Sequence, residues 1–477
     1  MKTVCLFIGL IGNTISFGQN VQARLSGAIK ALETDAQFKH AIISLYVVDS
    51  KTGNVVCEKN SQIGLAPASC QKVVTSVSAF EMLGNDFRYR TLIGKDYSTG
   101  DPDKSDAGCL FIIGGGDPTF GSWRWKSTTD TAIFSKIVES LKRQKFTSFN
   151  ENLVIEDYLY GFSVLPEGWI WQDIGNYYGA ACFGFNWREN QYDMILNPGE
   201  KPGYPADINT LKPFLYDVRI QNNIYTGKSG SGDNGYIYSS PFSNTIITKG
   251  TIPFQKEPFS ISGSMPNPSN VFRNDLMQFL AKNNITFRGQ SYSAIETVLN
   301  NTPVHKATHI IDSIFSPTLD SMNYWFLKKS INLYGEAFLK SLVRRKKGVD
   351  IGSNTYDTGI SIIKNFWKER GIEKSALNII DGSGLSPANR VTTHALVTVM
   401  QYARRQSWFP SFYYALPEAN GIKMKDGYIS GVRSYTGYIK SRSGVEYTFS
   451  FIVNNFDGSA GTVREKMWKL LDILKAP

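Results

Sequence analysis

The sequence predicts a mixed α/β protein in which antiparallel strands with flanking helices, near both ends of the chain, surround a large β-rich insertion. Near the start, two β-rich runs at 41–49 and 54–57 flank a polar turn and indicate a hairpin. Near the end, "VRSYTGYIKS" and "VEYTFSFIVNN" form a second antiparallel pair, followed by the amphipathic helix "REKMWKLLDILK". Residues 91–299 differ, with many glycines, short strands and few long helices. A chain of 477 residues exceeds one ordinary core, so more than one domain is expected.

Apolar residues at helical spacing predict the helices between these landmarks. A short helix around 21–33 precedes the hairpin, and another begins at Ser69 and ends before Gly84. From about residue 318 the pattern is helical again, in "LDSMNYWFLKKS", "INLYGEAFLKSLVRR" and "TGISIIKNFWKERG". A strand-to-loop signal, "IIDGSGLSPAN", and the helix "VTTHALVTVMQYARRQ" lead to the terminal strands.

Composition narrows the classes of partner. A hydrophobic content of 42% and a charged content of 19% fit a folded protein, and the net charge of +10 suits an anionic environment such as nucleic acid, a membrane surface or a polyanionic cell wall. No Lys/Arg tract is interleaved with aromatics, so no nucleic-acid partner is expected, and the run 344–347 is interpreted as a solvated helix end. His305 and His309 are four apart, but Lys306 stands where a zincin helix needs glutamate, so a metalloprotease site is not expected.

The N-terminus predicts export. An apolar run too short to span a bilayer follows Lys2, and Ser16 and Gly18 fit the small residues that signal peptidase requires. We therefore expect residues 1–18 to be a signal peptide that is cut before Gln19. Four cysteines remain after this cut, and their wide scatter leaves open whether they form disulfides or stay as buried thiols.

Ser69 and Lys72 form an S-x-x-K pair at the start of a helix. At this spacing both side chains lie on one face, so that the amine reaches the hydroxyl. The free backbone N–H groups of a helix N-terminus suit an oxyanion, and Lys72 would act as a base if burial or neighbouring cations lowered its pKa. An ordinary N-cap at Ser69 is the alternative. Ser361 and Lys364 match the same pattern but are expected on a helix surface.

Two further motifs follow in the chain. Ser330 and Asn332 form an S-x-N element, which would supply a proton-relaying hydroxyl and a substrate-orienting amide, with a helix N-cap as the alternative. Lys425-Asp426-Gly427 leads into the terminal strands. Lys425, at the start of a strand, would bind a substrate carboxylate, and Gly427 would let the substrate backbone approach the strand edge closely. The N–H of Tyr428 would then join that of Ser69 as a second oxyanion donor.

Two triplets with more usual spelling fall elsewhere. Residues 51–53, Lys-Thr-Gly, lie in the hairpin turn, and residues 228–230, Lys-Ser-Gly, lie in a Gly/Ser-rich loop. A turn before a strand is the structural alternative for the triplet at 425–427.

The order S-x-x-K, S-x-N, K-x-G, with 261 residues between the first two serines (330 − 69), resembles that of the class C low-molecular-mass penicillin-binding proteins. These are the D-alanyl-D-alanine carboxypeptidase/endopeptidase family of serine penicillin-recognising enzymes. Stretches along most of the mature chain are similar to this family, among them "APASCQK", "GGGDPTF", "PEGWIWQDIGNYYGA", "GSGDNGYIYSSPFSN", "LKKSINLYGEA", "DGSGLS" and "GVRSYTGY".

The resemblance implies a β-lactamase/transpeptidase-like domain at 19–90 and 300–477, split by an insertion at 91–299 with two subdomains. It implies cleavage of periplasmic peptidoglycan peptides through an acyl-enzyme, with β-lactams as covalent inhibitors and no metal or other cofactor. Position by position, Ser69 would be the nucleophile, Lys72 its base, Ser330 the proton relay and Asn332 a substrate-amide contact. Lys425 would contact the substrate carboxylate and the relay. The oligomeric state stays open.

Asp426 departs from the family pattern, which has Thr or Ser at the centre of the third motif. Two like charges about 4 Å apart interact by roughly 4 kcal/mol at an effective dielectric near 20. We therefore expect poor handling of free carboxylates and β-lactams compared with internal cross-links or amine-bearing substrates. Alternatively, Asp426 turns outward and pairs with a nearby Lys or Arg. A catalytically weakened wall-binding protein and a β-lactamase or esterase of the same fold are the competing functions.

Overall fold

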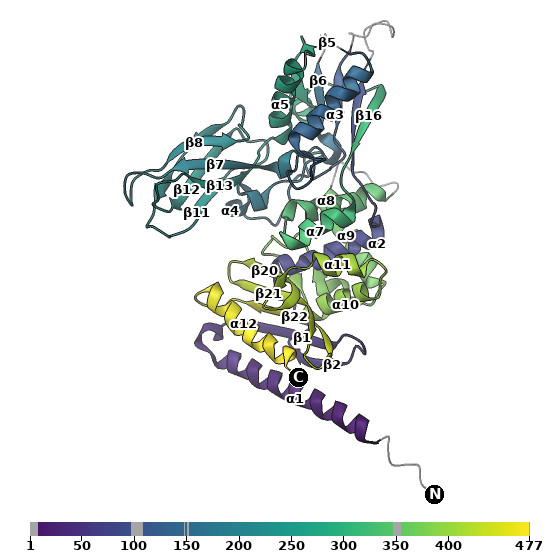
Figure 1. Ribbon diagram of the computed structural model, residues 1–477, viewed down its shortest axis with the longest axis vertical. Helices are drawn as coiled ribbons and strands as arrows, with labels where there is room; N and C mark the ends of the chain where they lie inside the picture. Colours follow the sequence, from purple (N-terminus) through teal and green to yellow (C-terminus); the bar gives the residue numbers. More distant parts are fainter. Residues whose placement is uncertain (1–7, 97–107, 147, 150–151, 347–353, 477) are drawn as a thin grey trace. The chain divides into compact units, whose positions relative to one another are not determined.

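The computed structural model describes residues 8–96, 108–146, 148–149, 152–346 and 354–476 (Figure 1). The chain folds into two compact units. Unit 1 contains Met1–Met82, Asn323–Ser330 and Ile360–Pro477, and unit 2 contains Leu83–Met322 and Ile331–Gly359. Among the described residues, no helix is long and apolar enough to cross a membrane.

Unit 1 is built on a six-stranded antiparallel sheet in the order β19-β20-β21-β22-β1-β2. Its strands are β1 (Ile42–Asp49), β2 (Val55–Lys59), β19 (Glu418–Ala419), β20 (Ile422–Ile429), β21 (Val432–Lys440) and β22 (Glu446–Asn454). The predicted hairpin is confirmed as β1 and β2, and the predicted terminal pair as β21 and β22. Residues from the two ends of the chain meet directly, because β1 pairs with β22 along its whole length.

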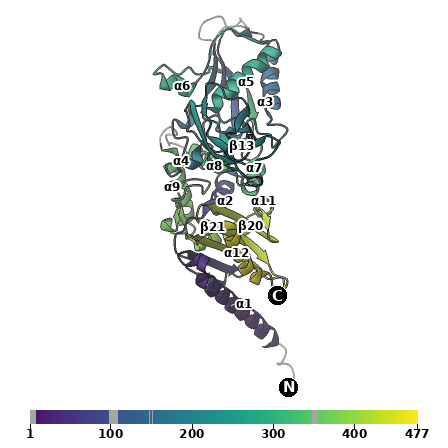
Figure 2. The same ribbon diagram turned by 90° about the vertical axis from the view of Figure 1, so that its left-hand side faces the viewer.

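Helices cover both faces of this sheet. Apolar residues of α1 (Ile8–Thr34) and α12 (Ala460–Lys475), such as Leu25 and Met467, pack in one core with sheet residues Leu45 and Phe451. Figure 2 shows α12 beside β20 and β21. On the opposite face, α10 (Thr393–Arg404) contributes Val397. The strands are therefore covered on both sides, which explains why β22 is buried almost throughout.

The remaining elements of unit 1 include several helices that the sequence predicted, and some of these helices extend into unit 2. Helix α1 begins earlier than the predicted helix at 21–33, and residues 1–7 of the expected signal peptide lie outside the described residues. The others are α2 (Lys72–Leu83), α7 (Leu319–Lys328), α9 (Thr355–Lys368), α11 (Phe409–Ala415), β17 (Leu377–Asn378) and β18 (Arg390–Val391).

The sequence placed Lys425 at the start of a strand without giving that strand bounds, and the structure shows it as β20. Lys425-Asp426-Gly427 was expected to lead into the terminal strand pair, but it lies within β20, which is itself paired with β21. Lys425 and Gly427 are buried although one is charged and the other has no side chain. They therefore break the alternation of apolar and polar residues that would have marked the strand.

Unit 2 contains a mixed five-stranded sheet in the order β15-β6-β4-β3-β16. The first three of these strands are parallel, and β3 and β16 continue the sheet antiparallel. The bounds are β3 (Arg90–Lys95), β4 (Leu110–Ile113), β6 (Leu153–Glu156), β15 (Ser291–Ser293) and β16 (His309–Phe315), with a separate parallel pair, β5 (Ser148–Phe149) and β14 (Thr286–Phe287). Two longer helices that the sequence did not individually predict, α3 (Asp130–Arg143) and α5 (Pro268–Lys282), share its core.

Two smaller sheets complete unit 2. One has the order β13-β7-β8, with β7 (Gln191–Asn197), β8 (Asp207–Lys212) and β13 (Phe259–Ser264). The other has the order β10-β12-β11, with β9 also paired to β12; its strands are β9 (Arg219–Gln221), β10 (Ile224–Thr226), β11 (Asn234–Tyr238) and β12 (Thr245–Ile252). The predicted loop at Lys228-Ser229-Gly230 lies between β10 and β11. The helices are α4 (Trp171–Ile174), α6 (Ala294–Leu299) and α8 (Asn332–Arg345).

Helix α8 is anchored within unit 2 by a strained turn. Arg188, Glu189 and Asn190 have φ angles of 53°, 54° and 52°, which place three successive residues in the left-handed region that non-glycine residues rarely occupy. Glu189 is buried and accepts hydrogen bonds from Arg124 and from the Tyr334 hydroxyl of α8. Contacts of this kind hold a strained backbone in place.

A buried lysine forms a second anchor of α8. The Nζ of Lys340 donates to the backbone oxygens of Ser163 and Cys182, both at 2.6 Å, and lies over the rings of Tyr160 and Tyr356. Its side chain is fully buried, and this burial lowers the pKa of Lys340 to about 8.

The lowered pKa of Lys340 predicts a rise of stability with pH. Between about pH 8 and 10.5 the unfolded chain keeps this proton while the folded chain releases it, so the stability contribution of Lys340 increases by at most about 1.4 kcal/mol per pH unit. Unfolding by urea at pH 7.5, 8.5 and 9.5 checks this. The stability of the wild type relative to Lys340→Met should increase across the series; a constant difference would contradict the assignment.

The four cysteines in the described residues, Cys57, Cys70, Cys109 and Cys182, are all buried and free. Of the two possibilities that the sequence left open, the structure has buried thiols. Burial raises the pKa of Cys70, beside Ser69, to about 11, so this thiol is protonated at neutral pH.

Candidate active site

Ser69 and Lys72 are brought together where a 3₁₀ turn, Ala68–Gln71, passes into α2. The Nζ of Lys72 lies 3.0 Å from the Oγ of Ser69 and donates a hydrogen bond to it. Lys72 is fully buried, whereas Ser69 is partly exposed. The amine thus approaches a hydroxyl that a substrate can reach, which is the arrangement that an activated serine nucleophile requires.

Residues distant in the sequence complete the surroundings of Lys72 within unit 1. Its Nζ also donates to the backbone oxygen of Ser383, at 2.7 Å, and lies 5.8 Å from the centre of the Phe326 ring. The loop at 381–386 packs on the start of α2, where Gln71 and Thr75 donate hydrogen bonds to its backbone oxygens. The sequence had marked "DGSGLS" as similar to the family but had given Ser383 no role, since a backbone carbonyl leaves no signature in the sequence.

The turn that carries Ser69 is strained and closely packed. Ala68 has a φ of 46°, in the left-handed region, which costs a non-glycine residue about 1–2 kcal/mol. A Cβ at Gly384, whose φ is 83°, would lie 2.0 Å from the oxygen of Ala68. Glycine is therefore required at 384 for the loop to support this turn, and strain of this kind is frequent at functional sites.

Strand β20 lies directly against the same turn. A Cβ at Gly427 would lie 2.9 Å from the backbone nitrogen of Ser69 and 2.7 Å from the oxygen of Pro67. The thiol of Cys70 donates to the oxygen of Lys425, at 3.2 Å. The structure therefore brings the third motif to the S-x-x-K motif, and Gly427 permits the close packing of the Ser69 turn on β20. The expected approach of a substrate backbone to Gly427 remains a prediction.

Lys425 and Asp426 form an ion pair with each other. The Nζ of Lys425 lies 3.1 Å from Oδ1 of Asp426, and it also donates a hydrogen bond to the backbone oxygen of Asp426, at 2.7 Å. The side chain of Lys425 is 1% exposed and that of Asp426 is 45% exposed. Burial raises the pKa of Asp426, but the charge and hydrogen bond of Lys425, together with Arg433, outweigh it and hold this pKa below its ordinary value. Asp426 is therefore ionised at neutral pH.

The S-x-N motif is divided between the two units. Ser330 belongs to unit 1 and has a φ of 57°, which lies in the left-handed region like that of Ala68. Asn332 opens α8 in unit 2, and its side-chain amide donates to the oxygen of Tyr178, at 2.8 Å. The N-cap of α8 is Ile331, and it makes no side-chain capping bond. The simple N-cap interpretation of this motif is therefore wrong.

The second S-x-x-K pattern has different partners. Lys364 of α9 donates to Oδ1 of Asn378, at 3.0 Å, and the Ser361 hydroxyl accepts from Asn365. The same four-letter pattern therefore occurs twice in the chain, and only at Ser69 does a distant loop bury the lysine. Tyr428 is 55% exposed, in β20, and the role of its N–H remains a prediction.

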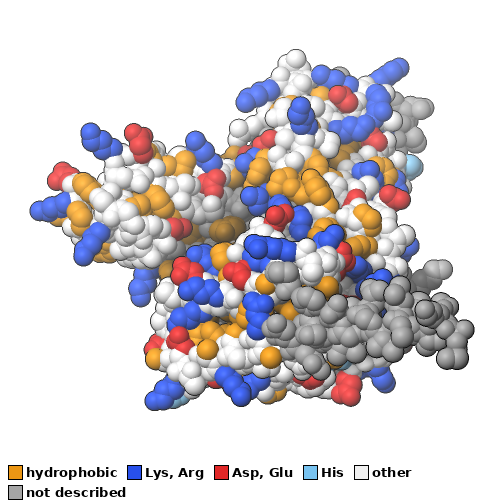
Figure 3. Space-filling view, turned by 60° about the horizontal axis from the view of Figure 1, so that its bottom comes forward, with side chains coloured by type: hydrophobic (Ala, Val, Ile, Leu, Met, Phe, Trp, Pro, Cys, Tyr) orange, Lys and Arg blue, Asp and Glu red, His pale blue; other side chains and the backbone are white. Residues whose placement is uncertain are grey.

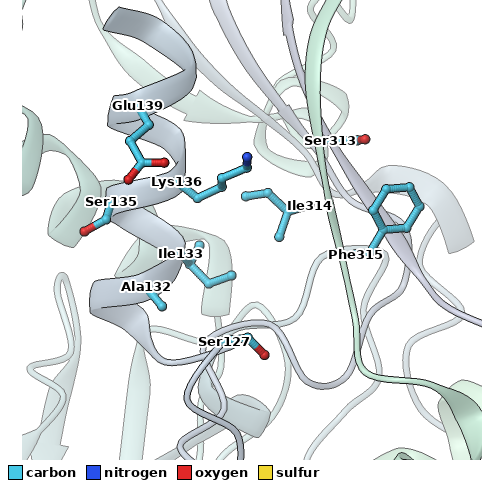
Figure 4. Close-up of a pocket in the computed structure, with 9 residues that line it drawn as sticks. All are labelled: Ser127, Ala132, Ile133, Ser135, Lys136, Glu139, Ser313, Ile314 and Phe315. Carbon is cyan, nitrogen blue, oxygen red and sulfur yellow. The ribbon is translucent and has the colours of Figure 1, made fainter. Parts of the chain in front are cut away.

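Three hollows formed by described residues of unit 2 are lined by none of the predicted site residues. One of about 550 Å³ lies between α3 and β16, and Lys136 points across it toward Ile314 (Figure 4). On the face shown in Figure 3, Lys and Arg side chains lie among Asp and Glu side chains instead of forming a single basic surface. Among the residues described, no three His, Cys, Asp or Glu side chains gather closely enough to hold a metal ion.

Comparison with known proteins gives consistent matches along most of the chain. The model of the D-Ala-D-Ala carboxypeptidase 3 (S13) family matches residues 25–473. A D-alanyl-D-alanine carboxypeptidase from a strain of Actinomadura is 24% identical over 91% of this chain and 81% of that protein. D-alanyl-D-alanine carboxypeptidase DacB of Haemophilus influenzae is 22% identical over 86% of this chain and 85% of its own.

A solved structure extends the comparison to the fold. The crystal structure of penicillin binding protein 4 (dacB) from Haemophilus influenzae superposes with a TM-score of 0.78 at 19% identity, covering 95% of this chain and 99% of that chain. A structure of the same protein in complex with a β-lactam has a TM-score of 0.73. This likeness confirms the predicted fold class.

Proposed function

The chain belongs to the D-Ala-D-Ala carboxypeptidase 3 (S13) family, and we propose that it cleaves peptides ending in D-Ala-D-Ala through an acyl-enzyme formed on Ser69. It is a serine peptidase and a low-molecular-mass penicillin-binding protein of class C, as its resemblance indicated. The observation that carries the proposal is the contact of 3.0 Å between the buried amine of Lys72 and the Ser69 hydroxyl.

The proposed reaction has two steps. Ser69 Oγ attacks the carbonyl carbon of the penultimate D-alanine while neutral Lys72 takes the hydroxyl proton. The backbone N–H groups of Ser69 and Tyr428 stabilise the oxyanion, and the Ser330 hydroxyl passes the proton to the leaving amine of the terminal D-alanine. Water then hydrolyses the ester on Ser69 and releases the shortened peptide. In this proposal Asn332 holds the amide of the bound peptide.

Lys425 and Asp426 set the substrate preference in this proposal. Lys425 is the cation that would bind the terminal carboxylate, but Asp426 already holds its ammonium group at 3.1 Å. A substrate carboxylate therefore competes with Asp426 for Lys425 and meets a like charge. Substrates without that carboxylate, such as cross-links in which the carbon that bears the acceptor amine carries no carboxylate, avoid both costs. We accordingly propose endopeptidase cleavage as the favoured reaction and carboxypeptidase cleavage as the slower one.

Replacing Asp426 by Thr is expected to speed acylation by labelled penicillin and release of D-Ala about tenfold, which corresponds to removal of about 1.4 kcal/mol of unfavourable interaction. The gain should be the same from pH 5 to 8, because the lowered pKa of Asp426 keeps it charged throughout that range. Cleavage of a cross-linked dimer should rise less. Unchanged rates for both reactions would contradict the proposed role of Asp426.

The natural setting of this proposal is the periplasm. Cleavage before Gln19 would release a mature chain that retains the whole family match, which begins at residue 25. Peptidoglycan peptides are the proposed substrates and β-lactams the proposed covalent inhibitors. We treat residues 19–90 and 300–477 as the catalytic domain and 91–299 as its insertion. The close contact of Ser69 with Lys72 favours an active enzyme over a weakened wall-binding protein.

Release of D-Ala from a soluble stem pentapeptide tests the function. Wild type and Ser361→Ala should release D-Ala at equal rates, because Ser361 belongs to the second S-x-x-K pattern. Ser69→Ala should release none. Equal release by wild type and Ser69→Ala would refute the assignment of the nucleophile.

A further inference from the structure

The sheet β10-β12-β11 of unit 2 exposes an aromatic face. Side chains alternate along β12, so that Ile247 and Lys249 point outward while Ile246 and Thr248 are buried. The strand register sets Tyr238 opposite Ile247 and Tyr236 opposite Lys249, and Tyr225 lies opposite Thr251 on the other side of β12. Outward residues from three strands therefore share one surface.

The tyrosines of this face are open to solvent. Tyr225 is 46% exposed and Tyr236 is 37% exposed. Trp171 of α4, 56% exposed, extends the row, because its ring centre lies 6.0 Å from that of Tyr238. On the lobe that carries β7 to β13, hydrophobic side chains lie in the surface among protruding Lys and Arg side chains (Figure 3). A group of exposed aromatic side chains on one surface indicates a binding site.

A hollow of about 480 Å³ lies on this face between Tyr225 and Tyr238. Gly250 lies in its floor, and β11 places Gly235 directly opposite Gly250, so part of the sheet under the tyrosines has no side chains. The lining is mainly apolar; Asn223 and Lys249 are its exposed polar residues, Thr248 is buried beneath it, and none of the described residues that line it carries a carboxylate.

We propose that this face binds the glycan strands of peptidoglycan, a polymer of amino-sugar rings with pendant carboxylates. A pyranose ring has apolar faces and a polar rim, which suits tyrosine rings beside amide and ammonium groups. Lys249 complements the carboxylates of the lactyl groups and stem peptides. A peptide that adds a strand would pair with a sheet edge, whereas these tyrosines stand on the flat face.

The inference rests on the proposed function in one respect: the peptide substrates are attached to this glycan. Binding of the polymer by unit 2 would hold the enzyme on the wall while it acts on successive peptides, because linked binding sites raise the effective concentration of the second partner.

The test uses the full chain and glycan strands freed of their peptides by an amidase and immobilised on a sensor surface. Wild type should bind, and the double variant Tyr225→Ala/Tyr238→Ala should bind at least about tenfold more weakly. The matched control is Tyr158→Ala, which removes a tyrosine of unit 2 that is 38% exposed and lies outside this face. Release of D-Ala from a soluble pentapeptide should be equal in all three, which shows that both variants are folded.

Four results would overturn the inference. The first is equal binding of glycan by the double variant and the wild type, and the second is no binding by the wild type. The third is binding of intact peptidoglycan but not of peptide-free strands, which would assign recognition to the peptides. Self-association of the wild type, measured by sedimentation, would also overturn the inference if the double variant did not self-associate, because this face would then bind a second copy of the chain. Failure of D-Ala release with preserved glycan binding would refute the proposed function and leave this inference standing.

Discussion

Replacing Lys72 by Met is expected to slow acylation of Ser69 by about 10²–10⁴-fold, the usual contribution of a general base. Methionine keeps an unbranched side chain of similar length but removes the amine that lies 3.0 Å from the Ser69 hydroxyl. It also leaves the carbonyl of Ser383 without this donor, because Lys72 is bonded to it at 2.7 Å. Stopped-flow measurement of acylation by a fluorescent penicillin gives the rate.

Lys364→Met is the matched control for this prediction. Lys364 occupies the same place in the second S-x-x-K pattern, but its amine donates a hydrogen bond from α9 to the side chain of Asn378 in β17. This variant should acylate at the wild-type rate. If both lysine variants lose activity equally, or if Lys72→Met keeps the wild-type rate, Lys72 is not the base.

Replacing Glu189 by Ala is expected to destabilise unit 2 by about 3–5 kcal/mol, because removal of one partner of a buried ion pair leaves the other charge uncompensated. Arg124 contacts Glu189 through Nε at 2.7 Å and through Nη2 at 3.1 Å, and the Arg124 side chain is 15% exposed. The Tyr334 hydroxyl would lose its acceptor as well, which would weaken the hold on α8. The strained turn at 188–190 would then lack the contacts that maintain it.

Urea unfolding followed by tryptophan fluorescence measures this effect. Glu33→Ala is the control, since Glu33 forms an exposed pair with Lys59 that is expected to contribute no more than about 1 kcal/mol. A similar small loss for Glu189→Ala would show that the buried network does not stabilise the turn. Glu189→Gln should recover part of the loss because the amide oxygen still accepts from Tyr334.

Local patterns in the sequence predicted the parts of the fold that depend on local rules. The hairpin of β1 and β2, the pair β21 and β22, and the start of α2 follow from alternation, turn residues and helical spacing. The contact between Ser69 and Lys72 could be predicted for the same reason, because side chains three positions apart on a helix lie on the same face.

Other features depend on contacts across the chain. Ser383 lies 311 residues from Lys72 and contributes a backbone oxygen, so no side-chain pattern could indicate it. The bounds of strand β20 were not evident because the charged Lys425 and Gly427, which has no side chain, are buried and interrupt the alternation of apolar and polar residues. The ion pair of Lys425 with Asp426 became evident only from their distance, although the sequence had raised pairing with a nearby cation as one outcome.

The most direct test of the central claim is the intact mass of the protein after incubation with excess penicillin. The wild type and Ser361→Ala should each gain the mass of one penicillin molecule, since opening of the β-lactam ring joins the whole molecule to Ser69. The adduct should persist for many minutes, in contrast to that of a β-lactamase, and should be absent in Ser69→Ala. An adduct of the same mass on Ser69→Ala would contradict an acyl-enzyme mechanism at Ser69. The absence of an adduct on both the wild type and Asp426→Thr would contradict it as well.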